Sequence, residues 1–523
     1  MSYIPLNCKT HYSVLEAYQK PKALSNTLDN LDIPRCGIAE FNNMSSSVKA
    51  LQAMPNTIMS YDSGDALLYA KNLAGWYELV RINNGGLDAR DAENIVTVYK
   101  RPVKDPVKDA WFGIDLNSGT DMRAYSSSRC VATPTYLASN EQDQKDYQIV
   151  MGLAQNKSME NLRKDNPHFF ENDWYVKDYD TLLKMGYTKQ ELANTNAISD
   201  LCEPIILPNE LQIPKFDSPE GYDSNGYLKF LCNEGFYRLG LQGNAEYIDR
   251  IKQEMVVIEK YHLEDYFLII RDIVTYINNT FGLSGVRGSA AGCLLSYLID
   301  ITKTDPIKHN LSFARFLNEG RFSEGRVQPP DIDVDIPSEA REETIRWIRE
   351  KYGEDRSGQI LTYQTIKSPA AIKAVFRINN TLSFQEINAI TKKLPPDHTI
   401  SDKLKESGDT SVIMWCLKHS DRLSEWVTYS DKGEMQGRFK NEFEQAVRLE
   451  GTNSARSKHA AGIIVSRERL TDTCPLVYDS VTKSHVCGME MNDLESGLGL
   501  LKLDLLGLRH LDKMLDIYRM LNS

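Results

Sequence analysis

The stretch PPDIDVDIPS, residues 329–338, sets three aspartates at every second position, with isoleucine or valine between them. Side chains alternate between the two faces of a β-strand, so a strand here places Asp331, Asp333 and Asp335 on one face and the apolar residues in a core. Three carboxylates this close repel one another unless cations neutralise them. Because carboxylate oxygens are hard ligands, the pattern predicts a site for Mg²⁺ or Mn²⁺.

Two other interpretations of this stretch compete with a metal site. An ordinary edge strand with a charged outer face stays open when the stretch is taken alone. A calcium-binding EF-hand loop also opens with D-x-D-x-D, and Glu342 stands at its twelfth position. The sixth position of such a loop needs glycine for its turn, but Ile336 stands there and Pro337 follows it. The backbone therefore excludes the EF-hand.

The composition is that of a folded protein with several domains. The chain has 523 residues, of which 41% are hydrophobic, and we expect roughly two to four domains. No window approaches the ~18 consecutive apolar residues of a membrane span, and the N-terminus lacks the pattern of a signal peptide. Nine cysteines are scattered without a C-x-x-C pair, which argues against zinc ribbons and a disulfide framework. We expect a cytoplasmic protein.

Charge and local pattern divide the chain further. The net charge of -11 does not by itself indicate nucleic-acid binding, although local basic patches can still bind phosphate. Residues 1–200 read as short strands and helices, and a linker rich in proline, glycine and aspartate is expected near 203–226. Apolar residues then recur at helical spacing as far as residue 281. They do so again in 338–353, where Ser338 is expected to cap a helix and Gly353 to end it. Residues 364–453 look helical and locally basic, and AAGIIVS and GLLKLDLLGL read as strands.

A second candidate site is GVRGSAAGC, residues 285–293. Small residues at a junction between loop and helix expose backbone amides at the positive end of a helix, and Arg287 adds a fixed charge. No G-K-[ST] closes the loop, so it is not a Walker A motif. Close packing of helices explains the glycines and alanines equally well if the loop stands alone. Together with a metal-binding strand, the loop favours a nucleotide site.

A third candidate is LLKLDLLGLRHL, where Asp504 lies in an apolar strand with Lys502 on the same face. A carboxylate in such a strand should meet a metal or a cation, and a buried Lys–Asp pair is the alternative. Further basic residues stand in ARSKHAAGIIV and ARFLNEGR, where a solvated surface role is the default for the charges alone. They are Arg456, Lys458, His459, Arg315 and Arg321.

With these segments assembled, the sequence resembles the alpha subunit of bacterial DNA polymerase III, a family C replicative DNA polymerase. The matching segments are RGSAAG, DPIKHNLSFARFLN, PDIDVDI, ARSKHAAGIIVS and LLKLDLLGLR, in the order of the family. The similarity runs along the chain from its N-terminus.

The resemblance implies an α/β and α+β multidomain fold. A degenerate phosphoesterase-type (PHP-like) domain would occupy residues 1–210, and a nucleotidyltransferase-type palm would occupy 211–363 and 454–523. A helical thumb would be inserted at 364–453, and the fingers, clamp-binding and oligonucleotide-binding domains of the family would be absent.

The resemblance also implies the roles of single residues. Asp331, Asp333 and Asp504 match the catalytic aspartates that bind two Mg²⁺ ions, or Mn²⁺, and Asp335 is the less certain neighbour. Residues near the incoming triphosphate are Arg287, Gly288, Ser289, Arg315 and Lys502, with Arg321 and Arg326 competing for one further position. Lys373, Arg377, Arg456, Lys458 and His459 would contact DNA.

Two departures from the family pattern matter. Where the family often carries histidine and acidic metal ligands in its N-terminal domain, this sequence has Asn7, Lys9, Glu40, Phe41 and Thr135. A histidine-rich metal cluster cannot be built there, so we expect a structural domain without hydrolytic activity. The chain also stops at Ser523, soon after Asp504.

The first hypothesis is therefore the palm-bearing part of a divided DNA-directed DNA polymerase in DNA replication, acting in the host cytoplasm if a phage encodes it. Its substrates would be primer-template DNA and deoxynucleoside triphosphates, and a second chain would supply the fingers and clamp-binding region. The alternative is a non-catalytic scaffold or DNA-binding subunit of a replisome. An independent phosphoesterase is disfavoured by the N-terminal substitutions.

Overall fold

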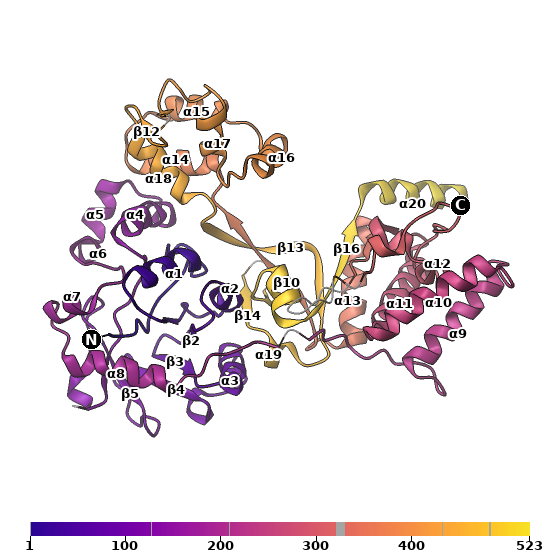
Figure 1. The fold of residues 1–523 in the computed structure, drawn as a ribbon, viewed down its shortest axis with the longest axis horizontal. Coiled ribbons are helices and arrows are strands. Elements are labelled where there is room, and N and C mark those ends of the chain that lie inside the picture. Colours follow the sequence, from indigo (N-terminus) through magenta and orange to yellow (C-terminus); the bar gives the residue numbers. More distant parts are fainter. Residues whose placement is uncertain are drawn as a thin grey trace. The chain divides into compact units, whose positions relative to one another are not determined.

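The computed structural model describes residues 2–522, apart from 127, 209, 319, 321–329, 431 and 481–482. The chain forms two compact units (Figure 1). Unit 1 comprises Met1–Ile205 and Tyr363–Ser457, and unit 2 comprises Ile206–Thr362 and Lys458–Ser523. Mixed helices and strands make up both units, which agrees with the α/β and α+β expectation. No helix in the described ranges combines the length and apolar character that crossing a membrane would require.

The first part of unit 1 is built on a mixed sheet with helices around it. The strands run in the order β1-β2-β3-β4-β5-β6, and β7 pairs with β5. Their bounds are Gly37–Ile38 (β1), Ile58–Asp62 (β2), Ala66–Ala70 (β3), Ile95–Tyr99 (β4), Trp111–Asp115 (β5), Thr120–Asp121 (β6) and Cys130–Ala132 (β7). The helices are Pro21–Asn30 (α1), Ser47–Ala53 (α2), Leu73–Asn83 (α3), Glu141–Gln155 (α4), Met159–Asp165 (α5), Pro167–Glu171 (α6), Tyr179–Lys184 (α7) and Lys189–Asp200 (α8).

The second part of unit 1 is the helical insert, residues 363–457. Its elements are α14 (Ser368–Ile378), α15 (Phe384–Lys393), α16 (Asp397–Ser407), α17 (Val412–His419), β11 (Thr428–Tyr429), β12 (Met435–Gln436) and α18 (Lys440–Leu449). The insert shares one hydrophobic core with the N-terminal segment, in which Ile149 and Val150 of α4 are buried together with Ile372, Val375 and the rest of the apolar face of α14. The two parts of unit 1 therefore form one packed body.

Unit 2 is built on a second mixed sheet. Its order is β14-β15-β10-β13-β16-β9-β8. The strands are Leu476–Asp479 (β14), Ser484–Cys487 (β15), Ser357–Thr365 (β10), Asn453–Val465 (β13), Leu501–Gly507 (β16), Asp333–Ile336 (β9) and Gly285–Arg287 (β8). The ends of β10 and β13 continue into the helical insert. The apolar residues of β9 and β16, among them Val334, Ile336, Leu503 and Leu505, are buried in one core.

Helices complete unit 2, and Figure 1 shows α9, α10, α11 and α12 gathered together. The helices are α9 (Ser224–Arg238), α10 (Ala245–Lys260), α11 (Glu264–Phe281), α12 (Leu294–Leu298), α13 (Arg341–Tyr352), α19 (Leu470–Thr473) and α20 (Arg509–Asn522). Gly353 ends α13 with a φ of 105°, as its position predicts. The capping role expected for Ser338 is wrong, because a 3₁₀ turn (Ser338–Ala340) precedes α13 and no side chain caps the helix.

Candidate functional site

Two neighbouring strands of unit 2 bring the aspartates together. Strand β9 pairs with β16 in parallel, and the register sets Asp333 directly beside Asp504. Asp331 lies just before β9. One oxygen from each of Asp331, Asp333 and Asp504 lies within 4.8 Å of the others. The aspartate cluster, as we call these three residues, thus joins acidic groups that are far apart in the chain.

The aspartate cluster suits a hard divalent cation. It offers three carboxylate oxygens, and Asp504 Oδ1 is buried with no hydrogen-bond partner among the described atoms. Gly462 faces Asp504 from β13, and a Cβ atom at Gly462 would lie 2.7 Å from Ile360 Cδ1 and 3.5 Å from Asp504 Oδ1. The glycine therefore keeps a side chain out of the space beside the orphaned oxygen. The donor set and this space fit a metal ion.

Asp335 differs from the cluster. Its Oδ1 lies 3.3 Å from Arg287 Nε, and its side chain is largely buried. Burial raises the pKa of Asp335, and Arg287 opposes that shift. Arg287 also lies 3.8 Å from Asp333, so one guanidinium neutralises both carboxylates. Asp335 belongs to this ion pair and not to the group of three.

Lys502 supplies the second positive charge at the site. Its Nζ lies 2.8 Å from Asp504 Oδ2 and 3.9 Å from Glu495 Oε2. Burial works against the charged lysine, but its hydrogen bond to Asp504 gives it a raised pKa. Burial also disfavours the charged form of Glu495 and raises its pKa to about 7. Sequence patterns did not single out Glu495, because LESGLG carries no alternation and resembles an ordinary polar turn.

The RGSAAG loop differs in part from its expected form. Gly288 begins a 3₁₀ turn with a φ of 79° and open space around its Cα, and Ser289 is half-buried. The helix that follows does not present free amides, because buried Glu254 accepts hydrogen bonds from Leu294 N at 3.0 Å and Leu295 N at 2.9 Å. The expected anion site at that helix end is therefore wrong, and any anion contact rests on the loop itself.

The remaining predicted basic residues lie in different settings. Arg315 is exposed at the end of a 3₁₀ turn, whereas Arg321 and Arg326 lie outside the described residues. In unit 1, Lys373 and Arg377 are exposed one turn apart on α14.

The three residues from ARSKHAAGIIV stand on β13. Arg456 is exposed and donates to the carbonyl of Tyr12 at 3.1 Å, and Lys458 is half-buried. His459 Nδ1 accepts a hydrogen bond from Gly462 N at 2.7 Å, and burial lowers the pKa of its imidazole. The imidazole is thus held on β13 beside Gly462, the residue that pairs with Asp504.

In the N-terminal segment, Lys9 stands where the family often carries a histidine ligand, and it forms a buried ion pair. Lys9 Nζ lies 2.6 Å from Asp62 Oδ2, also donates to the carbonyl of Ala39, and stands 4.3 Å from the centre of the Phe41 ring. Lys100 Nζ lies 2.6 Å from the other oxygen of Asp62. Lysine ammonium groups thus neutralise this carboxylate.

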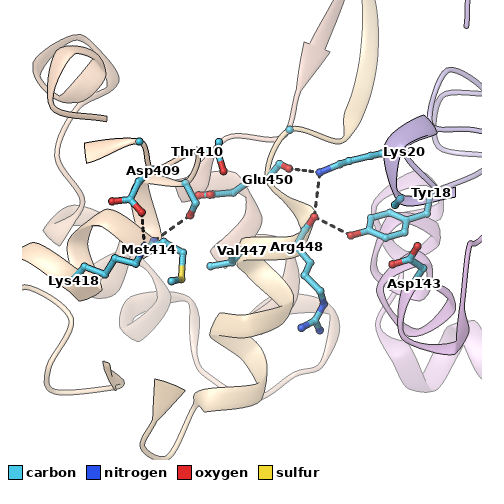
Figure 2. Close-up of a pocket in the computed structure, with 14 residues that line it drawn as sticks. Tyr18, Lys20, Asp143, Asp409, Thr410, Met414, Lys418, Val447, Arg448 and Glu450 are labelled. Atoms are coloured by element: carbon cyan, nitrogen blue, oxygen red, sulfur yellow. Dashed lines mark hydrogen bonds and ion pairs between the residues drawn. The ribbon is translucent and has the colours of Figure 1, made fainter. Parts of the chain in front are cut away.

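A cavity of ≈ 650 Å³ lies within unit 1, between the N-terminal segment and the helical insert. Figure 2 shows Tyr18 and Lys20 reaching toward the end of α18, where Tyr18 OH donates to Arg448 O at 2.8 Å and Lys20 Nζ to Glu450 O at 2.7 Å. Beside it, Arg448 Nε donates to buried Asp146 at 2.5 Å. These contacts fasten the base of the helical insert to the N-terminal segment.

Comparison with known proteins identifies the family to which the chain belongs. The family described as "Bacterial DNA polymerase III alpha NTPase domain" matches residues 226–507, more than half of the chain. The chain belongs to the bacterial DNA polymerase III alpha family. The matched span contains both aspartate segments, the RGSAAG loop and Lys502.

Relatives named DNA polymerase III subunit alpha extend the match. The protein of Ureaplasma parvum is 28% identical over 99% of this chain and 51% of its own length. That of Borreliella burgdorferi is 32% identical over 72% of this chain and 31% of its own, and that of Bacillus subtilis is 33% identical over 62% and 27%. The chain spans about a quarter to a half of the length of these polymerase III alpha relatives.

Proposed function

We propose that the chain is the palm-bearing part of a DNA-directed DNA polymerase that joins deoxynucleotides to a primer 3′-hydroxyl along a template. The observation that carries the proposal is the aspartate cluster, in a chain whose family consists of polymerase subunits. In this assignment, residues 211–363 and 454–523 form the palm and 364–453 the thumb.

The residues of the site divide the chemistry among them. Asp331, Asp333 and Asp504 would hold two Mg²⁺ ions, which when bound lower the pKa of the primer hydroxyl and neutralise charge on the triphosphate. Arg287 and Lys502, which neutralise carboxylates at 3.3 and 2.8 Å, would turn their charges toward the bound triphosphate. Gly288, Ser289 and Arg315 would orient its outer phosphates.

Contacts with DNA would come from the basic residues outside the aspartate cluster. Lysine and arginine on a thumb bind backbone phosphates without reading sequence, and this is the role proposed for Lys373 and Arg377. Arg456, Lys458 and His459 would contribute along β13.

The test is primer extension by the chain together with the chain that supplies the fingers, in the presence of Mg²⁺. Asp333→Asn and Asp504→Asn should each lower extension by about 10²-fold or more, because a metal ligand supports several kcal/mol of charge stabilisation. Asp249→Asn is the matched control, since Asp249 is an exposed aspartate on α10. Unchanged extension by Asp333→Asn would overturn the assignment. Absence of Mg²⁺-dependent nucleotide binding in calorimetry would favour the non-catalytic scaffold.

A second chain is proposed as a partner because helix α20 exposes several large apolar side chains. Met514, Ile517, Met520 and Leu521 are 54%, 58%, 76% and 81% exposed, whereas Leu515 is buried against the unit. Contiguous apolar side chains on a helix mark a protein interaction surface. The partner in this proposal is the polypeptide with the fingers, which would cover this face with apolar side chains of its own.

The partner surface can be tested by substitution on α20. Ile517→Lys should abolish co-purification of the second chain, because it places a charge in the apolar contact. Asp516→Lys adds the same side chain on the polar face of the same helix and should leave co-purification intact. Equal behaviour of the two variants would argue against this docking face.

The N-terminal part of unit 1, corresponding to the PHP-like assignment for 1–210, is proposed to lack hydrolytic activity. The buried pair between Lys9 and Asp62 supports this, because an ammonium group stands where a metal ion would need a ligand. Hydrolysis of phosphate esters by this segment would contradict it.

A further inference from the structure

We infer that Glu495 is a positioning residue, which holds the ammonium group of Lys502 ready for the triphosphate when divalent cations occupy the aspartate cluster. The inference rests on the proposed polymerase function and adds to it a residue with no direct contact to the reacting atoms. Lys502 Nζ donates to Asp504 Oδ2 at 2.8 Å and Met491 Sδ at 3.0 Å, and it forms a longer ion pair with Glu495 Oε2 at 3.9 Å.

The burial of these groups makes the choice of counter-charge important. The side chains of Lys502, Asp504 and Glu495 are 6%, 11% and 23% exposed. An ammonium group this deeply buried needs a nearby negative charge, since water cannot supply the compensation. Asp504 now provides it at the shorter distance, but Asp504 also belongs to the aspartate cluster. A cation bound there competes with Lys502 for the charge of Asp504.

Glu495 is the carboxylate that stays with Lys502 in that competition. It stands outside the group of three oxygens and is the second acidic residue within 4 Å of the ammonium group. With Asp504 engaged by a metal ion, Glu495 would remain as the acidic residue beside the Lys502 ammonium group and would hold it inside the site. A lysine held in this way is available to a triphosphate, whereas one bound tightly to Asp504 opposes metal binding.

The backbone around Glu495 is suited to a positioning role. Asp493–Gly497 forms a single π-helical turn, a rare conformation that is frequent at functional sites. Gly499 N donates to Glu495 O at 3.0 Å, and Leu500 N donates to Leu494 O at 3.0 Å. The turn is therefore hydrogen-bonded to the two residues just before β16, the strand that carries Lys502. Glu495 and Lys502 keep a fixed relation because one short segment bears both.

The experiment measures nucleotide binding to the full chain by calorimetry with Mg²⁺ and a deoxynucleoside triphosphate. Glu495→Gln preserves shape but removes charge, and we expect nucleotide affinity to fall about tenfold, since a buried charge loses its partner. In primer extension the same variant should raise KM for the nucleotide by a similar factor with little change in kcat. Glu495→Asp restores the charge and should recover most of the affinity.

Controls separate this inference from a structural effect and from the proposed function. Glu468→Gln removes an exposed carboxylate from unit 2 and should bind like the wild type. Thermal unfolding of Glu495→Gln separates the two roles, since a role in stability alone would lower Tm and leave KM unchanged, whereas the positioning role raises KM in the folded protein. If Asp333→Asn abolishes nucleotide binding but Glu495→Gln does not weaken it, the positioning role is wrong and the polymerase site stands. If the wild type binds no nucleotide, both proposals fall.

Discussion

At the scale of single residues, His11 is a buried neutral imidazole that makes stability depend on pH. Burial lowers its pKa to about 3, with Lys20 adding to the shift, and Nδ1 accepts a hydrogen bond from Asn453 N at 3.2 Å. The folded pKa lies below the unfolded value near 6.5. The contribution to stability is therefore complete above pH 6.5 and is lost as pH falls from there toward about 3.

A variant without a titrating group tests this pH dependence. His11→Gln keeps an acceptor but cannot be protonated, so its Tm should fall less than that of the wild type between pH 7.5 and pH 4.5. The Tm of the wild type minus that of the variant should therefore decrease from pH 7.5 to pH 4.5. Parallel loss of Tm in both proteins would show that His11 does not titrate in this range.

Sequence alone could predict some single residues of the site but not others. The family resemblance grouped Asp331, Asp333 and Asp504, and the structure places one oxygen of each within 4.8 Å of the others. Glu254 and Glu495 were missed. Glu254 accepts hydrogen bonds from amides about 40 residues away in the chain, and Glu495 lies in a π-helical turn that no sequence pattern marks. The amides of Leu294 and Leu295 show this, because the loop pattern predicts free donors and a residue from α10 occupies them.

At the scale of elements, the apolar face of α14 finds its partner in α4. Gly152 of α4 lies against Ile378 of α14, and a Cβ atom at Gly152 would stand 2.8 Å from two carbon atoms of that isoleucine. The sequence indicated helices within residues 1–200 and 364–453, but a helical pattern gives a buried face without identifying what covers it. The close contact between the two helices could not be read from the sequence for that reason.

Gly152→Val should destabilise unit 1 by about 1 to 3 kcal/mol, because it overpacks a filled contact. Gly86→Val, at an exposed glycine of the same unit, is the control and should cost much less. Combining Gly152→Val with Ile378→Ala should recover part of the loss. The measurement is the first thermal transition of the full chain, and equal losses in the two single variants would contradict the packing.

At the scale of the whole molecule, the helical insert and the N-terminal segment fold as one unit. Their common core and the ion pair between Asp146 and Arg448 join segments that the sequence presents as separate regions. The sequence pattern therefore predicted the helical insert, but it could not show that the insert shares its core with the N-terminal segment.

The shared core predicts the behaviour of a fragment. Residues 1–205 expressed without the insert should expose the apolar surface of α4, bind a hydrophobic dye and aggregate. Addition of residues 363–457 as a separate polypeptide should reduce dye binding. A fragment 1–205 that is monomeric, melts cooperatively and binds no dye would show that the insert is dispensable to this segment.

The parallel pairing of β9 with β16 has a consequence for synthesis of the chain. During translation β9 emerges long before β16, because the whole helical insert is made between them. An apolar strand that waits unpaired is a template for association with other nascent chains. Asp333 and Asp335 of β9, with Asp331 just before it, give every copy of this segment the same negative charge, so two unpaired copies should repel each other. We therefore expect these aspartates, of which Asp331 and Asp333 are also proposed metal ligands, to limit aggregation of the growing polypeptide until β16 has been made.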